Sequence, residues 1–584
     1  MIGWSFKRKP KLPPTKLEIL ARSERYMKRS RNRLIFMVLC VIVVYGVLVG
    51  RLIWFGLKDG QIEEASGPAY KISTARPDIV DRNGILLATD IKTYSLFAEP
   101  RRIIDANETI ELLATILPDL DWQATYNKLR TKAGFAWIER GLTPTQKEKI
   151  MALGIPGIGF RTEIRRFYPS GPTASHILGF VNVDNQGIAG MEKYIDQAGL
   201  SDLRAAGLVD ETSLKPVKLS IDIRVQAIVR DELEQAMQRY SAVSAGAAII
   251  NVHTGEVIAM SSVPDFDSNN PTGALQKDHL NRMTAGTYEM GSTIKTFTTA
   301  MALDSGKFNL ESLVDASKPL AAGRGRFIHD FHGKNRPLHL WEVFVFSSNI
   351  GSAKEALEIG IDGHRDFLKR LGLLTRMKTE LPEVARPVEP HPWRTVNSMT
   401  IAFGHGMMTT PLQTAVGAAA LVNGGILIEP TFLQRDEKTA MKNSTRVVSP
   451  KTSQDMRYLY KLNADIGSGR NARVDGYRVG GKTGTAEKVE NGKYSKTKVF
   501  NAFIAAFPIE NPQYVVITII DDPKPEEGTH STTAGFNAAP MVKQIIKRTA
   551  TFLGVRPNFG DELTPILAST KGLPETAMET TAND

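Results

Sequence analysis

Cysteine is almost absent from this sequence. The 584 residues contain a single one, Cys40, and it lies inside an apolar run. One cysteine excludes a disulfide framework and a thiolate metal site. The ten histidines include no His-Glu-x-x-His pattern, so nothing supports a zinc hydrolase. We therefore expect no metal and no cofactor.

Net positive charge is scarce outside the N-terminus. The formal net charge is +11, but residues 1–33 hold eleven Lys and Arg against two acids and so account for +9 of it. The rest of the chain is close to neutral. A nucleic-acid-binding surface on the body of the protein is therefore not expected.

The sequence contains only one long hydrophobic run. Residues 34–50 carry no charge, and apolar character resumes after one arginine and continues to Leu57. A run of this length predicts a single transmembrane helix over 34–57. The positive-inside rule then places residues 1–33 in the cytoplasm and residues 58–584 on the outer side of the membrane. A cleaved signal peptide is the alternative, but no small-x-small cleavage site follows the run.

The length predicts more than one domain, and the composition, 42% hydrophobic and 23% charged, is that of a folded protein. We expect an α+β protein with an extended pedestal domain over 58–215 that contains no visible catalytic pattern. Within it, Asn83-Gly84 predicts a hairpin, and apolar spacing predicts helix over 105–155. A second domain spans 216–556, and a loose tail spans 557–584.

The second domain has strand patterns at both ends and helical patterns between them. The apolar runs 245–252 and 256–262 flank a Gly turn and predict a β-hairpin. A helix is predicted over 292–305, and further strands over 499–507 and 514–521. This order predicts one sheet with a helical block inserted in it.

Three short motifs in that domain carry the chemistry. They are Ser292-Thr-Ile-Lys295, Ser347-Ser-Asn349 and Lys482-Thr-Gly484. Each is weak alone, since Ser495–Lys498 also matches the first pattern and Ser268–Asn270 the second. In this order, however, they are the parts of an active-site serine enzyme that attacks amides ending in a carboxylate.

The residue types fit a nucleophile and its base. Residues three apart share one face of a helix, so Lys295 lies beside the Ser292 hydroxyl and takes its proton once it is itself deprotonated by burial. Ser347 is placed to relay a proton to a leaving amine, and Asn349 to hold Lys295 and a substrate amide. The alternatives are a solvated helix face for the first motif and a helix N-cap for the second.

The third motif fits a carboxylate-binding strand edge. Lys482 and the hydroxyls of Thr483 and Thr485 are suited to hold a carboxylate, and Gly484 lets a substrate backbone approach closely. The backbone N–H groups of Ser292 and Thr485 are candidates for an oxyanion hole.

The same residues also satisfy a nucleotide-binding pattern. Gly476 to Thr483 matches Gly-x4-Gly-Lys-Thr, which requires a following helix. Here Asn491-Gly492 predicts a hairpin instead, and the site lies on the outer side of the membrane, so this interpretation is disfavoured.

With these motifs in place, the chain resembles a class B penicillin-binding protein over nearly its whole length. The resemblance rests on Arg76–Gly84, Gly246–Met260, Tyr288–Lys295, Phe403–Gly406 with Thr409–Gln413, and Gly535–Pro540. One departure is Met290, where proline is usual. Within class B, the segment from Gly481 to Tyr494 looks most like the division (FtsI) branch, and the elongation branch is the alternative.

The resemblance implies a serine β-lactamase-like transpeptidase fold with an antiparallel sheet, and a peptidoglycan D,D-transpeptidase that β-lactams acylate. Ser292 would attack the D-Ala-D-Ala amide with Lys295 as base, and an amine of a neighbouring stem peptide would take the acyl group. The pedestal would dock partners: a membrane glycosyltransferase of the FtsW-like SEDS type and other divisome proteins.

Three other interpretations remain open. A membrane-anchored β-lactam sensor would carry more spans than the one predicted here. A β-lactamase needs a deacylating carboxylate, for which no clear motif exists. A non-catalytic scaffold is disfavoured by the intact serine, lysine and asparagine set.

Overall fold

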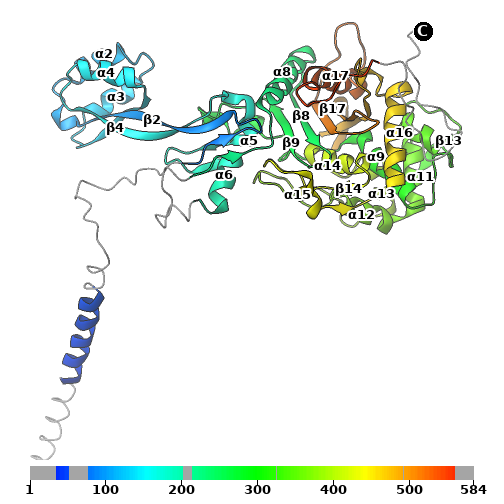
Figure 1. Ribbon diagram of the computed structural model, residues 1–584, viewed down its shortest axis with the longest axis horizontal. Helices are drawn as coiled ribbons and strands as arrows, with labels where there is room; N and C mark the ends of the chain where they lie inside the picture. Colours follow the sequence, from blue (N-terminus) through cyan, green and yellow to red (C-terminus); the bar gives the residue numbers. More distant parts are fainter. Residues whose placement is uncertain (1–34, 52–75, 201–213, 324, 491, 560–584) are drawn as a thin grey trace, which may run out of the picture. The chain divides into compact units, whose positions relative to one another are not determined.

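The computed structural model describes residues 35–51, 76–200, 214–323, 325–490 and 492–559, and the chain divides into the units Met1–Lys71 and Ile72–Asp584. In the first unit, residues 35–51 form a helix whose side chains are all exposed (Figure 1). Within the described ranges, no helix combines the length and the apolar character that crossing a membrane requires. The rest of the predicted span, residues 58–75 of the predicted pedestal and the predicted tail from residue 560 on lie outside these ranges.

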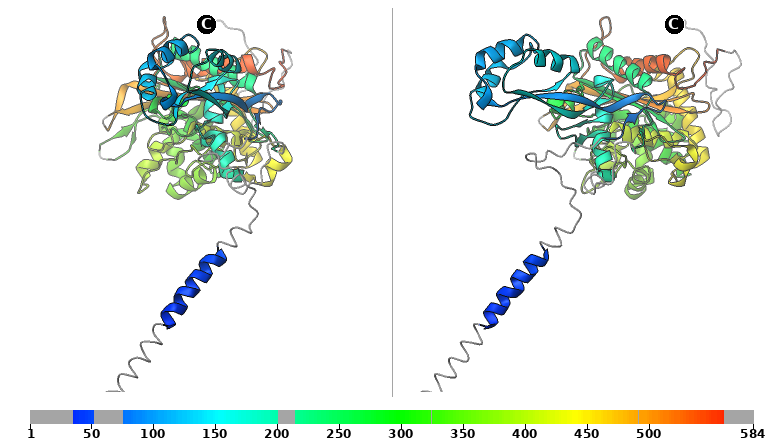
Figure 2. Two further views of the ribbon diagram at one scale, coloured as in Figure 1. Left: turned by 90° about the vertical axis from the view of Figure 1, so that its left-hand side faces the viewer. Right: turned by 60° about the vertical axis from the view of Figure 1, so that its left-hand side comes forward.

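The N-terminal part of the second unit is built on a long antiparallel ladder. Strand β2 (Leu86–Ala98) pairs with β4 (Ile158–Phe167) from Thr89 opposite Phe167 to Ala98 opposite Ile158. In Figure 2 this ladder leads to a lobe of three short helices. They are α2 (Ala106–Ala114), α3 (Trp122–Leu129) and α4 (Pro144–Ala152).

The prediction of helix throughout 105–155 was wrong at its centre. Residues Ala136–Leu142 form strand β3, which pairs with β2. Ile138 and Leu142 from this strand enter the lobe's core with residues of α2, α3 and α4. The helical spacing of apolar residues before and after this strand led to the prediction of one continuous helical region. The strand's own residues Trp137 and Ile138 favour extended structure.

The base of the pedestal joins the second domain. Strand β1 (Ile79–Val80) pairs with β2 and, in parallel, with β7 (Val217–Lys218), which lies beyond residue 215. The remaining elements of the base are β5 (Phe180–Val181), β6 (Gly187–Ala189), α5 (Ser175–Leu178) and α6 (Gly190–Ile195). Side chains of the base share one hydrophobic cluster with the second domain, so the two pack continuously.

The second domain contains a five-stranded antiparallel sheet in the order β16-β17-β18-β8-β9. Its strands are β8 (Ser244–Asn251), β9 (Val257–Val263), β16 (Gly480–Glu490), β17 (Lys493–Phe507) and β18 (Tyr514–Asp521). The predicted hairpin, the two later strands and the single sheet are confirmed. Strand β16 lies at the free edge of the sheet.

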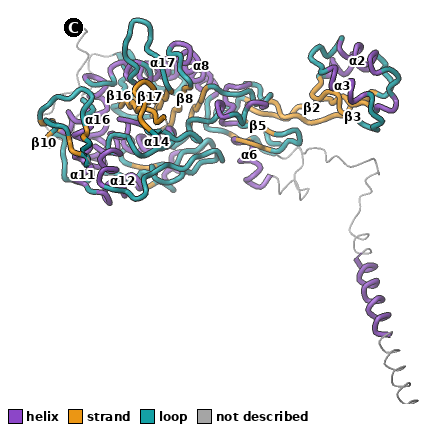
Figure 3. The backbone as a smooth tube through the Cα atoms, turned by 180° about the vertical axis from the view of Figure 1, so that it is seen from behind, coloured by secondary structure: helices purple, strands orange, loops and turns teal. Residues whose placement is uncertain are grey.

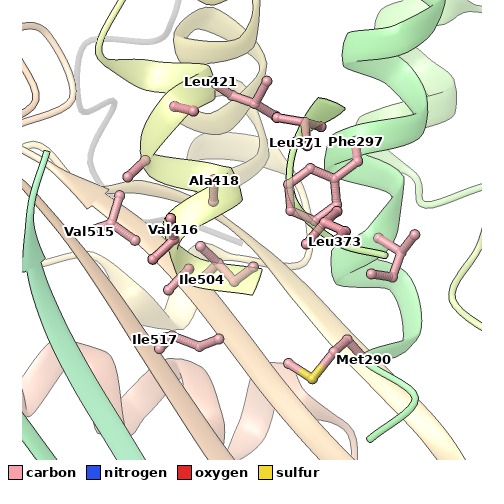
Figure 4. Close-up of a cluster of buried hydrophobic side chains, with 14 of the residues drawn as sticks. Met290, Phe297, Leu371, Leu373, Val416, Ala418, Leu421, Ile504, Val515 and Ile517 are labelled. Carbon is pink, nitrogen blue, oxygen red and sulfur yellow. The ribbon is translucent and has the colours of Figure 1, made fainter. Parts of the chain in front are cut away.

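Both faces of the sheet are buried. Phe503 and Phe507 enter one cluster with α8 (Ile223–Arg239) and α17 (Ala538–Thr549), whereas Ile504 enters the other, as the period of two along a strand requires. Figure 3 shows α8 and α17 on one side of the strands and α14 on the other. In Figure 4, Ile504 and Ile517 of the sheet face Val416, Ala418 and Phe297 of the helices.

A helical block separates β9 from β16, as predicted. Its helices are α9 (Lys295–Asp304), α10 (Leu340–Val345), α11 (Asn349–Ile359), α12 (Ile361–Arg370), α13 (Thr395–Ile401), α14 (Pro411–Val422), α15 (Glu437–Lys442) and α16 (Pro450–Ile466). Three two-stranded pairs complete it: β10 (Leu313–Asp315) with β13 (Pro337–His339), β11 (Leu320–Ala321) with β12 (Phe327–Ile328), and β14 (Ile426–Leu427) with β15 (Thr445–Arg446).

Candidate active site

Ser292 lies on a tightly enclosed turn. Residues Gly291–Ile294 form a single 3-10 turn that continues into α9, and Ser292 is partly exposed while its neighbours are buried. A Cβ atom on Gly404 would stand 1.9 Å from the carbonyl oxygen of Gly291, and one on Gly484 2.4 Å from that of Met290. Only glycines permit this approach, so the turn is held between the loop at Gly404 and strand β16.

The main chain of Thr485 lies against the same turn. A Cβ atom on Gly291, whose φ is +52°, would stand 2.6 Å from the carbonyl oxygen of Thr485 and 3.0 Å from its nitrogen. The first backbone N–H groups of a helix have no hydrogen-bond partner within the helix. The backbone N–H of Ser292 is therefore available to bind an anion. The main chains of Ser292 and Thr485, whose backbone N–H groups form the predicted oxyanion hole, therefore lie close to each other.

Lys295 is completely buried, and its ammonium group has three oxygen partners. Its Nζ lies 2.5 Å from the carbonyl oxygen of Ser347, 3.1 Å from the Ser347 hydroxyl and 2.7 Å from Oδ1 of Asn349. Burial lowers the pKa of Lys295 well below its usual range, the charge of Lys482 lowers it further, and Asp330 and Glu355 oppose the shift. The lowered pKa favours the neutral amine, which is the form of a lysine that accepts a proton.

The Ser347 hydroxyl lies between two lysines. Nζ of Lys482 is 3.0 Å from Oγ of Ser347, which Nζ of Lys295 also contacts at 3.1 Å. Ser347 has a φ of +58°, a left-handed conformation that a non-glycine residue adopts only when its surroundings require it. A hydroxyl that accepts from both lysines keeps its own proton available for a third group, which is the property of a relay.

The predicted carboxylate-binding residues line the edge strand β16. Lys482 is fully buried, and this burial lowers its pKa to about 7. The Thr483 hydroxyl lies 2.6 Å from that of Ser468, and the Thr485 hydroxyl accepts from the backbone N–H of Ala534 at 3.0 Å. Lys482 lies within strand β16, which pairs with β17, where a nucleotide-binding loop requires a helix to follow; the prediction of a hairpin in place of a nucleotide-binding loop is confirmed.

Sequence reasoning missed Asp330, which holds the Ser347–Asn349 segment. Its carboxylate accepts from the Ser348 hydroxyl at 2.7 Å and from the backbone N–H of Ile350 at 2.9 Å. Asn349 also donates to the carbonyl oxygen of His329 at 3.0 Å. Ser348, rather than Asn349, is the N-cap of α11, through its bond to Gly351. No local pattern connects Asp330 with a motif that lies 18 residues later.

A second missed group, Glu289, His405 and Tyr494, lies at the rim of the site. Oε1 of Glu289 accepts from the Gly406 N–H at 2.7 Å and from the Tyr494 hydroxyl at 3.2 Å. The ring of His405 lies 5.4 Å from that of Tyr494. Burial, aided by the charge of Lys295, lowers the pKa of His405 to about 4, so this imidazole is neutral. Met290, the departure from the family pattern, packs into the core beneath the sheet (Figure 4).

Metal chemistry finds no support in this arrangement. Across the part of the chain that the structure describes, no three His, Cys, Asp or Glu residues are grouped as potential metal ligands.

Comparison with known proteins agrees with this geometry. The model of the "Penicillin binding protein transpeptidase domain" matches residues 245–547, and that of the "Penicillin-binding Protein dimerisation domain" matches residues 71–201. A probable peptidoglycan D,D-transpeptidase FtsI of Caulobacter vibrioides is 39% identical over 507 residues, 84% of each chain. The peptidoglycan D,D-transpeptidase FtsI of Escherichia coli K12 is 30% identical and covers 83% of this chain and 86% of its own.

A solved structure supports the fold alone. The crystal structure of a peptidoglycan synthetase from Bifidobacterium adolescentis superposes with a TM-score of 0.63 at 21% identity and covers 83% of this chain and 96% of that one. The chain therefore belongs to the penicillin-binding proteins with a serine-type transpeptidase domain. With its dimerisation domain and its similarity to the FtsI proteins, it is a class B penicillin-binding protein of the FtsI type, as the motifs predicted.

Proposed function

We propose that this protein is a peptidoglycan D,D-transpeptidase that cross-links stem peptides through an acyl-enzyme on Ser292. The single observation that carries the proposal is the hydrogen-bond network of Lys295, which follows Ser292 by three residues. The buried Lys295 contacts Ser347 and Asn349, and Lys482 contacts the same Ser347 hydroxyl. The relatives named as peptidoglycan D,D-transpeptidases support the substrate class.

The first half-reaction uses Lys295 as the base. The Ser292 Oγ–H proton passes to Nζ of Lys295 as Oγ bonds to the carbonyl carbon of the penultimate D-Ala. The tetrahedral oxyanion faces the N–H groups of Ser292 and Thr485. When the C–N bond breaks, the proton returns through the Ser347 hydroxyl to the leaving nitrogen of D-Ala.

The second half-reaction reverses these transfers. An amine of a neighbouring stem peptide attacks the acyl-enzyme, and Ser347 and Lys295 take up its proton and return one to Ser292 Oγ as the C–O bond breaks. Before acylation, in the first half-reaction, Lys482 and the Thr483 and Thr485 hydroxyls bind the terminal carboxylate of the donor, which leaves with the D-Ala. Asn349 orients the donor amide and Lys295 together.

Labelling with a fluorescent penicillin tests the nucleophile, because a β-lactam acylates the same serine. The full-length protein should be labelled, and Ser292→Ala should not be. The matched control is Ser495→Ala, the serine of the second Ser-x-x-Lys pattern, which should be labelled as the wild type is. Equal labelling of the Ser292→Ala variant and the wild type would sink the assignment.

We further propose that the enzyme acts at the division septum, anchored in the inner membrane by a single helix over 34–57 with residues 1–33 in the cytoplasm. The described helix over 35–51 exposes every side chain, including Phe36 at 68% and Val47 at 65%, which suits an apolar surrounding. The basic segment before it favours the cytoplasmic side.

The pedestal over 58–215 is proposed to dock an FtsW-like glycosyltransferase and other divisome proteins, beside the transpeptidase domain over 216–556. Its lobe exposes Ile104 and Trp122, residue types frequent at interfaces. Depletion of the protein distinguishes division from elongation. Filaments are expected, and round cells would assign it to elongation instead.

A further inference from the structure

Glu289 is an acid beside the nucleophile for which the proposed reaction has no use. It precedes Ser292 by three residues and is partly buried. Its Oε1 atom accepts a hydrogen bond from the backbone N–H of Gly406 at 2.7 Å and another from the Tyr494 hydroxyl at 3.2 Å. Both donors belong to exposed residues, so this oxygen lies on the solvent side of the carboxylate.

The residues on both sides of Glu289 pack on one loop. The preceding residue, Tyr288, forms an antiparallel bridge with Thr409. A Cβ atom on Gly404 would stand 1.9 Å from the carbonyl oxygen of Gly291, which follows two residues later. Glu289 is therefore fixed at the side of the turn that carries the nucleophile.

The charge of Glu289 has no basic partner among the described side chains. Only burial and the two hydrogen bonds act on its titration: burial raises the pKa of Glu289, and the bonds from Gly406 and Tyr494 oppose that rise. The neighbouring imidazole of His405 is neutral, because burial lowers its pKa to about 4. The second oxygen of Glu289, Oε2, is buried and has no hydrogen-bond partner in the same part of the chain. The negative charge is therefore uncompensated.

The second half-reaction brings a cation to this rim. A primary alkyl amine has a pKa of about 10, as the lysine side chain does, so an acceptor amine of this kind arrives as an ammonium. Lys295 and Lys482 repel it when they are charged, since both Nζ atoms lie at the Ser347 hydroxyl. A carboxylate at the entrance offsets this repulsion and attracts the ammonium.

Asp330 and Glu487 also border the site, but neither is as well placed. Asp330 is already occupied by two donors at the start of α11. Glu487 of β16 is exposed, and its charge acts on Tyr494 together with that of Glu289. It adds to the negative charge of the rim, but of these two rim acids only Glu289 is held by hydrogen bonds in the described part of the chain.

We propose that Glu289 binds the protonated amine of the acceptor stem peptide and so determines how well this amine competes with water for the acyl-enzyme. The ammonium donates to Oε1 at the rim. It gives one proton to solvent water as it moves to the acyl carbon, and the transfers of the second half-reaction then follow. No covalent bond is made or broken at Glu289, and the inference rests on the proposed acyl-enzyme at Ser292.

The experiment measures how the acyl-enzyme divides between transfer and hydrolysis. The full-length protein is acylated with a thioester analogue of the donor peptide, and both products are quantified at rising acceptor concentration. Because both products come from one intermediate, their ratio does not depend on the acylation rate. One acceptor is a peptide with a free lysine ε-amine, which is charged at neutral pH, and the other is hydroxylamine, which is not.

Glu289→Gln keeps an oxygen that accepts from Gly406 and Tyr494 but removes the charge. This variant should need about 3- to 10-fold more lysine peptide than the wild type to make transfer equal to hydrolysis, which is the size expected for one charged contact near the surface. The loss should be absent with hydroxylamine. Transfer to hydroxylamine also shows that the variant is folded.

Tyr494→Phe separates the charge of Glu289 from its hold on the β16–β17 hairpin. It removes the hydroxyl that occupies Oε1 and leaves the carboxylate in place, so transfer to the lysine peptide should equal or exceed that of the wild type. The matched control is Glu490→Gln, which removes an exposed acid of the same hairpin that is bound to Lys498 at 2.6 Å. This control should behave as the wild type does.

An unchanged transfer to the lysine peptide in Glu289→Gln, or an equal loss with both acceptors, would overturn the inference. A loss in Tyr494→Phe as large as that in Glu289→Gln would do the same, since it would reduce Glu289 to an anchor of the hairpin. So would a selective loss that appears in Glu487→Gln instead. Failure of the proposed function is separate, because penicillin would then still label Ser292→Ala.

Discussion

Nζ of Lys482 lies 3.0 Å from Oγ of Ser347, while burial alone accounts for the lowered pKa of this lysine. No carboxylate contributes to that shift, so the folded enzyme carries a buried cation whose countercharge is missing. A substrate carboxylate would supply that countercharge. The uncompensated charge of Lys482 therefore lowers the folding stability of the substrate-free enzyme, and a bound carboxylate would offset this loss.

Replacing Lys482 by methionine should stabilise the free protein and impair acylation. The pKa falls from its ordinary value to about 7 in the folded state, so the unfolded state binds more protons between about pH 7 and about pH 10.5. Wild-type stability therefore rises with pH through that window. The thermal advantage of Lys482→Met should be full below about pH 7 and disappear toward pH 10.5.

Differential scanning calorimetry at several pH values checks the stability, and penicillin labelling checks the acylation, which should fall roughly 100-fold or more. Lys488→Met serves as the control, because this lysine on the same strand is paired with Asp521 at 2.6 Å. A variant no more stable than the wild type at pH 6 would contradict the argument.

Asp330→Ala should slow acylation without unfolding the domain. Its carboxylate accepts from Ser348 and from the backbone of Ile350, so its loss leaves two donors of the Ser347 turn unpaired, at a cost of about 1–3 kcal/mol. We expect the acylation rate to fall roughly 10- to 100-fold, because Ser347 is no longer fixed between the two lysines. The control is the exposed Asp315, whose Oδ1 accepts from the backbone of Ser317. Equal rates for both alanine variants would count against this role.

The residues that sequence could predict are those whose relationship is local. Ser292 and Lys295 lie at helical spacing, and Lys482 to Thr485 form one strand, so short motifs suffice. Asp330 reaches the site only through tertiary packing and lies outside any motif. His405 lies in the family segment Phe403–Gly406, but nothing local in that segment predicts its contact with Tyr494. Strand β3 was missed for a related reason, because its pairing with β2 outweighs the helical spacing on either side.

Gly404→Ala should disable the active site through backbone contact alone. Its new Cβ would stand 1.9 Å from the carbonyl oxygen of Gly291 and would push the Ser292 turn away from β16. A shift of about 1 Å can cost roughly 100-fold in rate. Gly424→Ala is the control. Its φ of +95° is close to the +97° of Gly404, so both substitutions strain the backbone alike, but nothing lies within 4 Å of a Cβ atom on residue 424. Gly424→Ala should lose about 1–2 kcal/mol of stability and keep penicillin labelling. Gly404→Ala should lose more stability, because its Cβ meets backbone atoms, and should lose labelling.

Glu192→Gln should unfold the base of the pedestal before it affects the catalytic chemistry. Its buried carboxylate binds both Arg76 and Arg166 at 2.7 Å, and the side chains of all three are fully buried. Removing the charge leaves two buried guanidinium groups short of a partner, which costs about 3–5 kcal/mol. Thermal unfolding should show a large decrease in melting temperature, whereas Glu99→Gln, which removes an exposed ion pair with Arg102, should change stability by less than about 1 kcal/mol. At low temperature both variants should still be labelled by penicillin, because every residue of the Ser292 network lies in the second domain. Loss of labelling by folded Glu192→Gln would mean instead that the pedestal controls the active site directly.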